Sequence, residues 1–383
     1  MRTITFLQPR RLTFGPGCLT ECIAYVAALG APRIHIISST SIAGCVDGLR
    51  VALEHSGCIV SVDLSINAEP TLNAFQEALL RARKVEPTCI LGIGGGSPLD
   101  VAKLIAAFVY SKQTVQETFG IGLLSSRQCH LVCIPTTSGT GSEVSPNAIL
   151  LDEAAALKKG VVSPFLVPDA TFVDPELTHS VPSVVTAFTG LDALTHCVEA
   201  YTNNFAHPLV DLYALEGIAL CARHLAAAVR DGSDAEARSG MSLASLYGGL
   251  CLGPVNTAAV HALSYPLGGE FHLAHGLSNA ILLAAVFRFN ATAAPQRHAQ
   301  VARALGAPVG KSDEQTAEIG AGLLAKLVED CGVVCDLGRY GVRREDIPRL
   351  AESAMTVTRL LKNNPRPIEK SDAEKLYEDC FSR

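Results

Sequence analysis

The feature that most restricts the possible fold is a change of pattern near residue 175. Before it, short apolar or β-branched runs alternate with stretches of helical periodicity. Such alternation is typical of parallel strands joined by crossover helices. After it, strand patterns nearly vanish and helical patterns take over. We therefore expect an α/β domain over residues 1–176 and an all-α domain over residues 177–383.

The expected elements follow from periodicity. In the first part we expect strands over Arg33–Ser38, Thr88–Ile93 and His130–Pro135, helices over Leu72–Lys84 and Pro98–Tyr110, and short strands between Pro146 and Asp174. In the second part we expect helices over Val184–Tyr201, Pro208–Val229, Ala235–Leu252, Asn256–Leu263, Gln296–Leu305, Glu314–Cys331, Ile347–Leu361 and Ser371–Phe381.

The composition argues against several classes of protein. Hydrophobic residues make up 48% of the chain, which is enough apolar material for a sizeable core. The net charge of −6 argues against a nucleic-acid-binding protein, which normally carries a basic face. The most apolar stretch, Ala280–Phe287, is too short to cross a bilayer. We expect no nucleic acid and no membrane among the partners.

The N-terminus and the cysteines indicate a compartment. The first residues, MRTITFLQPRR, contain no apolar core of a signal peptide. The 13 cysteines are scattered and lack zinc-finger spacing, which is typical of reduced thiols. We therefore expect a cytoplasmic protein.

A glycine-rich loop joins a predicted strand to a predicted helix in CILGIGGGSPLDVAK. Gly94, Gly95 and Gly96 let the main chain approach a ligand closely, and Ser97 follows them. Free N–H groups at a helix start attract an anion, for which a dinucleotide pyrophosphate is the natural candidate. Because the loop matches neither the Walker A nor the GxGxxG pattern, a tight turn without a ligand is the alternative.

A second polar loop follows the strand pattern HLVCIP and carries Thr136 and Thr137. Ligands of open α/β sheets bind at the carboxyl ends of the strands. This loop is therefore a candidate for phosphate or ribose contacts, and a polar loop without a ligand is the alternative.

Three histidines and one aspartate form a candidate metal site. Asp192 and His196 are four residues apart and share one face of a predicted helix. His261 and His275 lie in a second segment, HALSYPLGGEFHLAH. Three imidazoles and one carboxylate suit Fe²⁺ or Zn²⁺. An Asp–His pair on a helix also occurs in ordinary protein cores, and that is the alternative.

Together these motifs resemble the iron-containing (group III) alcohol dehydrogenase family. The resemblance runs from TFGPG at residues 13–17 to NNPRP near the C-terminus, through GGGSPLDVAK, IPTTSGTGSE, PDATFVDPEL and TGLDALTHCVEAY. It implies a Rossmann-like N-terminal domain and a helical C-terminal domain, an architecture shared with dehydroquinate-synthase-like enzymes. It also implies a metal-dependent oxidoreductase that transfers a hydride between NAD or NADP and a small alcohol, aldehyde or ketone.

The resemblance assigns roles to individual residues. The metal ligands that it implies are Asp192, His196, His261 and His275. The cofactor contacts that it implies are Gly94, Gly95, Gly96, Ser97, Thr136, Thr137, Asn147 and Lys158. It places Asp100 close to the active site, and the alternative is that Asp100 only positions the start of its helix.

Two positions depart from the family pattern. Tyr265 stands where family members often carry a histidine in the proton path, and it is either a proton donor or a wall of the substrate pocket. Ser39 stands where NAD-preferring members often carry an acidic residue. The missing acid admits NADP, and the alternative is that Ser39 merely ends a strand.

Other functions remain to be weighed. A dehydroquinate-synthase-like or glycerol-dehydrogenase-like enzyme would share the fold and act on a sugar acid or a polyol. A lyase for a phosphorylated sugar acid needs a cluster of basic residues, and residues 177–287 carry only Arg223, Arg230 and Arg238. The complete set of candidate ligands disfavours a non-catalytic protein. The resemblance implies a homodimer, which we expect to form through an edge of the first domain.

Overall fold

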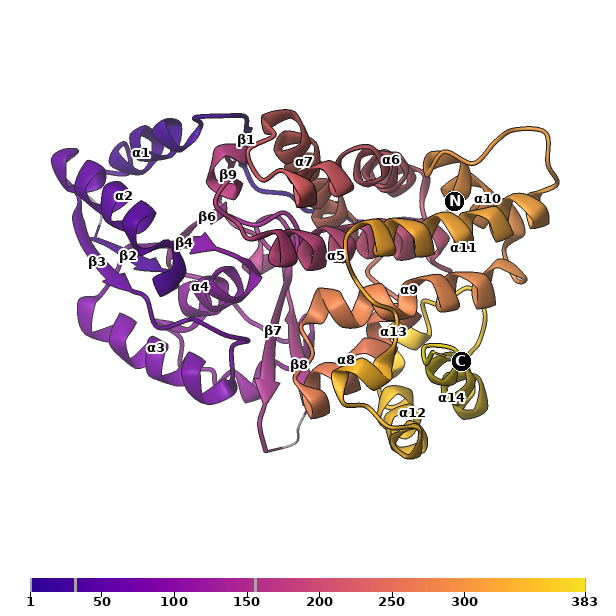
Figure 1. The fold of residues 1–383 in the computed structure, drawn as a ribbon. Coiled ribbons are helices and arrows are strands. Elements are labelled where there is room, and N and C mark those ends of the chain that lie inside the picture. Colours follow the sequence, from indigo (N-terminus) through magenta and orange to yellow (C-terminus); the bar gives the residue numbers. More distant parts are fainter. Residues whose placement is uncertain (1, 31–32, 155–156, 383) are drawn as a thin grey trace. The chain divides into compact units, whose positions relative to one another are not determined.

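A parallel sheet with the strand order β1-β9-β6-β4-β2-β3 forms the framework of the first part of the chain (Figure 1). The computed structural model describes residues 2–30, 33–154 and 157–382. The strands of this sheet are β1 (Arg11–Phe14), β2 (Arg33–Ile37), β3 (Ile59–Asp63), β4 (Cys89–Gly94), β6 (His130–Pro135) and β9 (Ala170–Val173). Every neighbouring pair runs parallel, which confirms the α/β class predicted for this part.

Helices cover both faces of this sheet. They are α1 (Leu19–Ala27), α2 (Ala43–His55), α3 (Leu72–Val85) and α4 (Gly96–Phe108). Leu91 and Ile93 of β4 pack with α1 and α2, whereas Ile90 packs with α3 and α4. This alternation follows from the two-residue period of a strand. Because both faces of β4 and β6 are buried, these central strands are nearly continuous apolar runs in the sequence.

A second, smaller sheet has the strand order β5-β8-β7. Its strands are β5 (Gly120–Ile121), β7 (Asn147–Asp152) and β8 (Leu157–Val162). β7 and β8 pair antiparallel, and β7 packs against α4. β7, β8 and β9 account for the short strands predicted between residues 146 and 174, whereas β5 lies outside that range.

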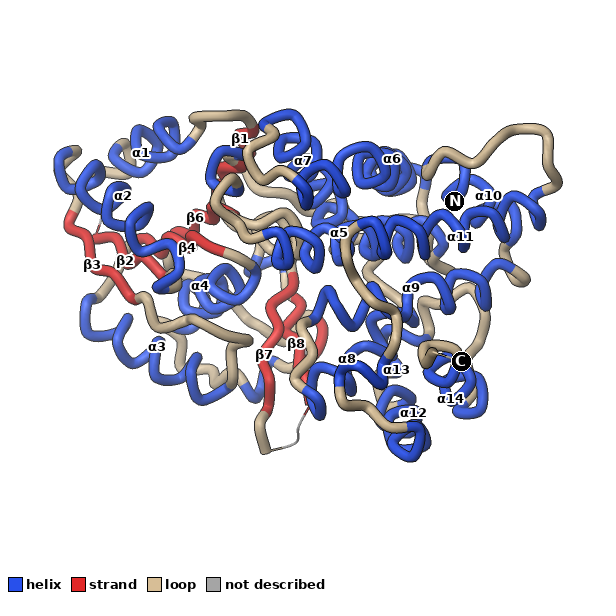
Figure 2. The backbone as a smooth tube through the Cα atoms, viewed as in Figure 1, coloured by secondary structure: helices blue, strands red, loops and turns tan. Residues whose placement is uncertain are grey.

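Helices make up the regular structure of the second part of the chain, as Figure 2 shows for the residues described there. The α-helices are α5 (Ser183–Thr202), α6 (Pro208–Arg230), α7 (Ala235–Leu252), α8 (Ala259–Phe271), α9 (His275–Ala291), α10 (Pro295–Ala304), α11 (Asp313–Asp330), α12 (Ile347–Met355), α13 (Thr358–Leu361) and α14 (Lys370–Glu378). α5 packs against α6, α7 and α9 and is buried along most of its length. The all-α prediction for this part is confirmed.

The chain divides into two compact units. One unit holds Phe6–Thr137 and Gly141–His179, and the other holds Ser180–Arg383 together with Met1–Thr5 and Ser138–Thr140. We call them the sheet unit and the helical unit. The predicted domain limits of 1–176 and 177–383 stay a prediction.

Several helix predictions differ from the structure, and α1 and α2 of the sheet unit were not predicted. α9 was not predicted, because its segment is apolar on almost every side and shows no helical period. The helix predicted to end at Leu263 continues through Pro266, and the Tyr377 hydroxyl donates a hydrogen bond to the Leu263 carbonyl one turn earlier. The helix predicted over Ile347–Leu361 breaks after Met355, where three consecutive β-branched residues follow.

Among the described residues, one helix is long and apolar enough to cross a membrane, namely α6. The sequence search for a span did not single it out. Its apolar side chains Val210, Ala214 and Ile218 are buried, and the helix packs against α5 and α7. Packing against α5 and α7 therefore accounts for part of its hydropathy, since 39% of its most apolar stretch is buried.

Helix α9 begins in close contact with the main chain of α5. A Cβ built at Gly276 would overlap the carbonyl group of Phe188 and lie 2.6 Å from its carbonyl carbon. The same Cβ would lie 3.3 Å from Cβ of Asp192. Glycine at this position therefore sets how closely the two helices approach.

We predict that Gly276→Ala lowers the free energy of unfolding by about 1–3 kcal/mol, because α9 must move away from α5 to admit the methyl group. Gly322→Ala is the matched control, since Gly322 lies within α11 with open space around the Cβ position. The control should be neutral or stabilising by up to about 1 kcal/mol. Urea unfolding followed by circular dichroism measures both, and equal stabilities of the two variants would contradict the close approach.

His298 on α10 is a buried histidine in the helical unit. Its Nδ1 lies 2.8 Å from the Ala294 carbonyl oxygen, and its ring lies edge-on to Phe287 at 4.7 Å between centroids. Burial lowers the pKa of His298 from 6.5 to about 4. In this pH interval the unfolded chain binds the proton and the folded chain does not. Stability is therefore fully present above pH 6.5 and decreases as the pH falls towards 4.

We predict that His298→Asn, which keeps a donor for Ala294 but does not titrate, removes roughly 2 kcal/mol of the stability loss over this pH interval. His55→Asn is the matched control, because His55 is exposed and also contacts the carbonyl oxygen four residues earlier, at 2.7 Å. Urea unfolding at a series of pH values measures the slopes. An unaltered slope in His298→Asn would refute this assignment.

Candidate metal centre and cofactor loops

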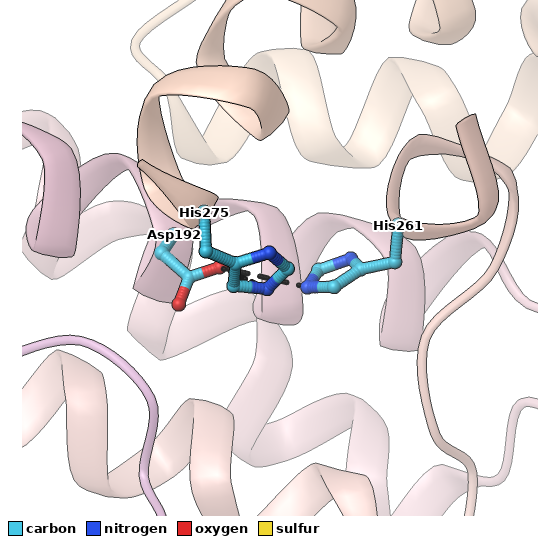
Figure 3. Close-up of side chains that lie close together, drawn as sticks. All are labelled: Asp192, His261 and His275. Atoms are coloured by element: carbon cyan, nitrogen blue, oxygen red, sulfur yellow. Dashed lines mark ion pairs between the residues drawn. The ribbon is translucent and has the colours of Figure 1, made fainter. Parts of the chain in front are cut away.

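Three helices of the helical unit bring the predicted metal-ligand residues together. Asp192 and His196 lie one turn apart on α5, His261 lies on α8, and His275 is the first residue of α9. In Figure 3 the carboxylate of Asp192 and the rings of His261 and His275 point toward one another. The close start of α9 against α5 is what places His275 beside Asp192.

The candidate ligand atoms converge on one point. Oδ1 of Asp192 lies 3.5 Å from Nε2 of His261, 3.6 Å from Nε2 of His275 and 3.7 Å from Nε2 of His196. One ligand atom each from Asp192, His261 and His275 lies within 4.8 Å of the other two. His196 stands outside this closest group, and its ring stacks on His261 at 4.8 Å between centroids. One carboxylate oxygen and imidazole nitrogens at this spacing suit Fe²⁺ or Zn²⁺.

The electrostatics of the centre favour a bound cation. Burial raises the pKa of Asp192, but the imidazoles of His196 and His275 outweigh it and hold that pKa well below its usual range. Burial lowers the pKa of His261, but the carboxylates of Glu199 and Asp192 outweigh it, so the pKa is raised. Two buried carboxylates need positive charge nearby, supplied either by protons on the imidazoles or by a metal ion. The residues present therefore fit a divalent metal.

Asn279 was missed by the sequence reasoning. Its Nδ2 lies 2.7 Å from Oδ1 of Asp192, 3.2 Å from Nε2 of His261 and 3.4 Å from Nε2 of His275. Its Oδ1 is buried and has no hydrogen-bond partner among the described residues. The amide nitrogen therefore lies within 3.4 Å of three of the candidate ligand atoms. Its position four residues after His275 on a helix was the available signal.

Glu199 was also missed, although it lies in the quoted motif TGLDALTHCVEAY. Its Oε2 lies 2.6 Å from Nδ1 of His261, and its Oε1 accepts a hydrogen bond from the Val260 N–H at 2.6 Å. Both side chains are buried. A carboxylate on the far nitrogen of a metal-binding histidine fixes the ring and its tautomer. The three-residue spacing from His196 was the signal that pointed to it.

Tyr265 lies one helical turn after His261 on α8 and is buried. Its ring centroid is 6.2 Å from that of His275. Its hydroxyl oxygen accepts a hydrogen bond from Nη2 of Arg359 at 3.1 Å. The structure therefore places a phenol beside the candidate metal centre and a guanidinium beside that phenol.

The glycine-rich loop lies where β4 passes into α4 in the sheet unit. Gly94 ends β4 with φ of +148°, and a Cβ there would lie 2.9 Å from Cγ of Pro98. Gly95 is the N-cap of α4, Gly96 begins the helix and Ser97 follows in its first turn. The first N–H groups of an α-helix have no acceptor one turn earlier in the helix, and the start of α4 lies at the carboxyl end of β4. This is the geometry of an anion site.

The second loop lies beside the first. The Thr136 N–H donates a hydrogen bond to the Gly94 carbonyl at 2.9 Å. A Cβ at Gly95 would lie 3.4 Å from Oγ1 of Thr137. Because β4 and β6 are neighbours in the sheet, the two predicted cofactor loops meet at one edge.

The other predicted cofactor residues lie elsewhere in the sheet unit. Ser39 follows β2, and its hydroxyl lies 2.7 Å from that of Ser41. Asn147 begins β7, and its Oδ1 is buried without a hydrogen-bond partner in the described part of the chain. Lys158 on β8 is buried and forms an ion pair with Glu69. A buried carbonyl oxygen without a partner makes Asn147 the best supported of these three.

Asp100 lies on α4, and both of its carboxylate oxygens are engaged within the sheet unit. Oδ1 accepts a hydrogen bond from the Ser142 hydroxyl, and Oδ2 accepts one from the Ile149 N–H at 2.9 Å. The Lys103 ammonium lies 3.9 Å from Oδ1. These contacts join α4 to the second loop and to β7, which favours a positioning role over contact with substrate.

Two family models match the chain. A model described as "Iron-containing alcohol dehydrogenase" matches residues 9–175. A second model, "Fe-containing alcohol dehydrogenase family, C-terminal", matches residues 186–381. The two matches meet close to the boundary between the sheet unit and the helical unit.

Individual proteins agree with these models. The chain is 37% identical to long-chain-alcohol dehydrogenase 1 of Geobacillus thermodenitrificans (strain NG80-2), over 96% of this chain and 94% of that protein. It is 31% identical to sulfoacetaldehyde reductase of Bilophila wadsworthia (strain 3_1_6), over 97% of each. A crystal structure of 1,3-propanediol oxidoreductase matches with a TM-score of 0.96 at 31% identity, covering 99% of this chain and 100% of that chain. The chain belongs to the iron-containing alcohol dehydrogenase family and is an oxidoreductase of that family.

Proposed function

We propose that the protein interconverts a small alcohol and its aldehyde or ketone, with NAD(H) or NADP(H) and one Fe²⁺ or Zn²⁺ ion. The observation that carries this proposal is the convergence of Asp192, His261 and His275 on one point, with His196 against Asp192. The relatives named above act on long-chain alcohols and on sulfoacetaldehyde, so family membership by itself does not select a substrate.

The roles of the side chains follow from their contacts. A divalent ion supplies a Lewis acid that polarises the substrate oxygen. Asp192, His196, His261 and His275 would hold this ion. Reduction adds a hydride from the nicotinamide to the carbonyl carbon and a proton to its oxygen. We assign the proton to Tyr265, because its phenol lies beside His275, and its alternative role is a wall of the substrate pocket.

The sheet unit would bind the dinucleotide. We assign the pyrophosphate to the start of α4 at Gly94 to Ser97, with Thr136 and Thr137 against it. The unpartnered Oδ1 of Asn147 supports a contact with a ribose hydroxyl. No carboxylate stands at Ser39 to repel a 2′-phosphate, so we propose that NADPH is accepted as well as NADH.

Assembly and compartment complete the proposal. β1 and β3 are the edge strands of the large sheet, and Ile59 of β3 is 66% exposed. An exposed apolar edge supports a homodimer formed through the sheet unit. All thirteen cysteines are free thiols, which supports a reducing, cytoplasmic compartment.

We predict that the protein purified without chelator holds about one equivalent of iron or zinc and oxidises NADH or NADPH in the presence of small aldehydes. His261→Ala should lose most of the metal and lower kcat/KM by about 100-fold or more, since one ligand is gone. Elemental analysis and absorbance at the reduced nicotinamide band measure both quantities.

The matched control is His272→Asn, which removes an exposed histidine of the same segment and keeps a residue that tolerates the left-handed φ of 54°. It should leave metal content and turnover unchanged. Full metal content and turnover in His261→Ala would overturn the ligand assignment. Bound metal without turnover on any carbonyl compound would overturn the reaction class.

Glu199 supplies a further test of the metal centre. We predict that Glu199→Gln weakens metal binding by about 10- to 100-fold, because the carboxylate no longer holds the proton on Nδ1 of His261 and keeps Nε2 available. Competition with a chromogenic chelator measures the Kd. Glu216→Gln is the control, since Glu216 forms an exposed ion pair with Arg223. Equal metal affinity in both variants would show that Glu199 serves only the packing of α5 on α8.

A further inference from the structure

Arg359 is held beside the candidate metal centre by the packing of a short helix. α13 packs on α8, and their apolar contact is formed by Ala262, Tyr265, Val357 and Leu360. Leu360 is 1% exposed, so α13 is fixed at its apolar side. The next residue toward the N-terminus, Arg359, is half-buried and reaches the hydroxyl of Tyr265.

Among the described residues, the guanidinium of Arg359 has few partners for its positive charge and its N–H donors. Its one hydrogen bond to a described residue is the donation to Tyr265 at 3.1 Å, and its Cζ lies 6.0 Å from the centre of that ring. A guanidinium offers five N–H donors. In the ranges the structure describes, it forms no ion pair with a carboxylate. The single acidic residue of α8, Glu270, pairs with Arg349 instead, at 2.8 Å.

Two other arginines of the helical unit, the half-buried Arg297 and the buried Arg238, have more hydrogen-bond partners than Arg359. Arg297 pairs with Asp211 and also donates to the Tyr201 carbonyl. Arg238 has no acidic partner within ion-pair distance in the described part of the chain, but it donates to two carbonyl oxygens and to the Thr186 hydroxyl. Arg359 is left with one neutral oxygen, although burial makes an unsatisfied guanidinium costly.

The charged side chains of the chain segment around Arg359 are all positive. Between Glu352 and Glu369 the chain carries Arg359, Lys362 and Arg366 and no acidic residue. Arg366 donates to the Phe289 carbonyl and the Thr292 hydroxyl, whereas the Lys362 side chain is exposed. The potential at Arg359 is therefore positive and is not cancelled by its neighbours along the chain.

We propose that the substrate is a small aldehyde or alcohol that carries an anionic group, a sulfonate or a carboxylate, and that Arg359 binds this group. The inference rests on the proposed function, because it takes the reacting carbon to lie at the centre formed by Asp192, His261 and His275. The ring of Tyr265 lies beside that of His275, and its hydroxyl is hydrogen-bonded to the guanidinium of Arg359. A chain of a few carbon atoms along the phenol would join the reacting oxygen to an oxyanion at Arg359, which a guanidinium binds through two parallel hydrogen bonds.

The test uses the metal-loaded full chain and two matched pairs of aldehydes. Sulfoacetaldehyde is compared with propanal, and succinic semialdehyde with pentanal, for the wild type and Arg359→Met. The wild type should favour the anionic member of at least one pair in kcat/KM. Arg359→Met should lower kcat/KM roughly 10- to 100-fold more for that anionic aldehyde than for its neutral counterpart, mainly through KM. The favoured pair distinguishes a sulfonate from a carboxylate.

Two further variants separate recognition from support of the fold. Lys362→Met removes one positive charge from the same segment without contact to Tyr265, and it should change both members of a pair equally. Arg359→Lys should retain part of the preference for the anionic aldehyde, because it keeps the positive charge but loses the two parallel hydrogen bonds of a guanidinium.

A binding measurement is independent of turnover. The ligand 2-hydroxyethanesulfonate should raise the Tm of the wild type and not that of Arg359→Met, whereas 1-propanol should affect both proteins alike.

The outcomes are distinct. If the wild type reduces neutral aldehydes without preferring anionic ones, or if Arg359→Met lowers neutral and anionic turnover equally, Arg359 only supports Tyr265 and the inference is overturned while the proposed function stands. If none of the four aldehydes is reduced with NADH or NADPH, the proposed function fails and the inference falls with it.

Discussion

The candidate metal centre depends on how closely α9 can start against α5. Gly276 has no side chain, and a Cβ at this position would overlap the carbonyl group of Phe188. His275 immediately precedes this glycine, so the same contact that packs the two helices also sets the distance between its imidazole and Asp192. Packing and ligand geometry are therefore one constraint in this unit, and neither can change without the other.

Burial of charge explains why so many polar side chains gather around that contact. Asp192 and Glu199 lie on α5 among apolar residues, and each is nearly inaccessible to solvent. Such carboxylates persist only when donors or cations satisfy them. His261 is held between the two, and Asn279 donates to Asp192 from α9. The arrangement orients the imidazoles before any ion binds, which lowers the cost of forming the site.

The central strands β2, β4 and β6 of the sheet unit could be predicted from sequence, because they are mostly buried and apolar, whereas the half-exposed edge strands β1 and β3 could not. The spacing of Asp192 and His196 likewise defines one helix face without further information. Other features depend on contacts between distant residues. α9 has no amphipathic period, since it is buried on almost every side, and Arg359 reaches Tyr265 across 94 positions of sequence. Glu199 and Asn279 lay in recognised motifs, but their roles follow from distances that a motif does not give.

In the helical unit, the candidate metal ligands and the residue proposed to select the substrate lie on different elements. The candidate ligands lie on α5, α8 and α9, which are long and mutually packed, so their positions tolerate little change. α13 has four residues and rests on α8 through Val357 and Leu360. Arg359 on this segment reaches Tyr265 but is none of the candidate ligands, so it can differ without removing a ligand. A residue such as Arg359 can therefore change the accepted substrate while the reaction stays the same, which is the asymmetry expected when rigid elements hold a site and short segments line it.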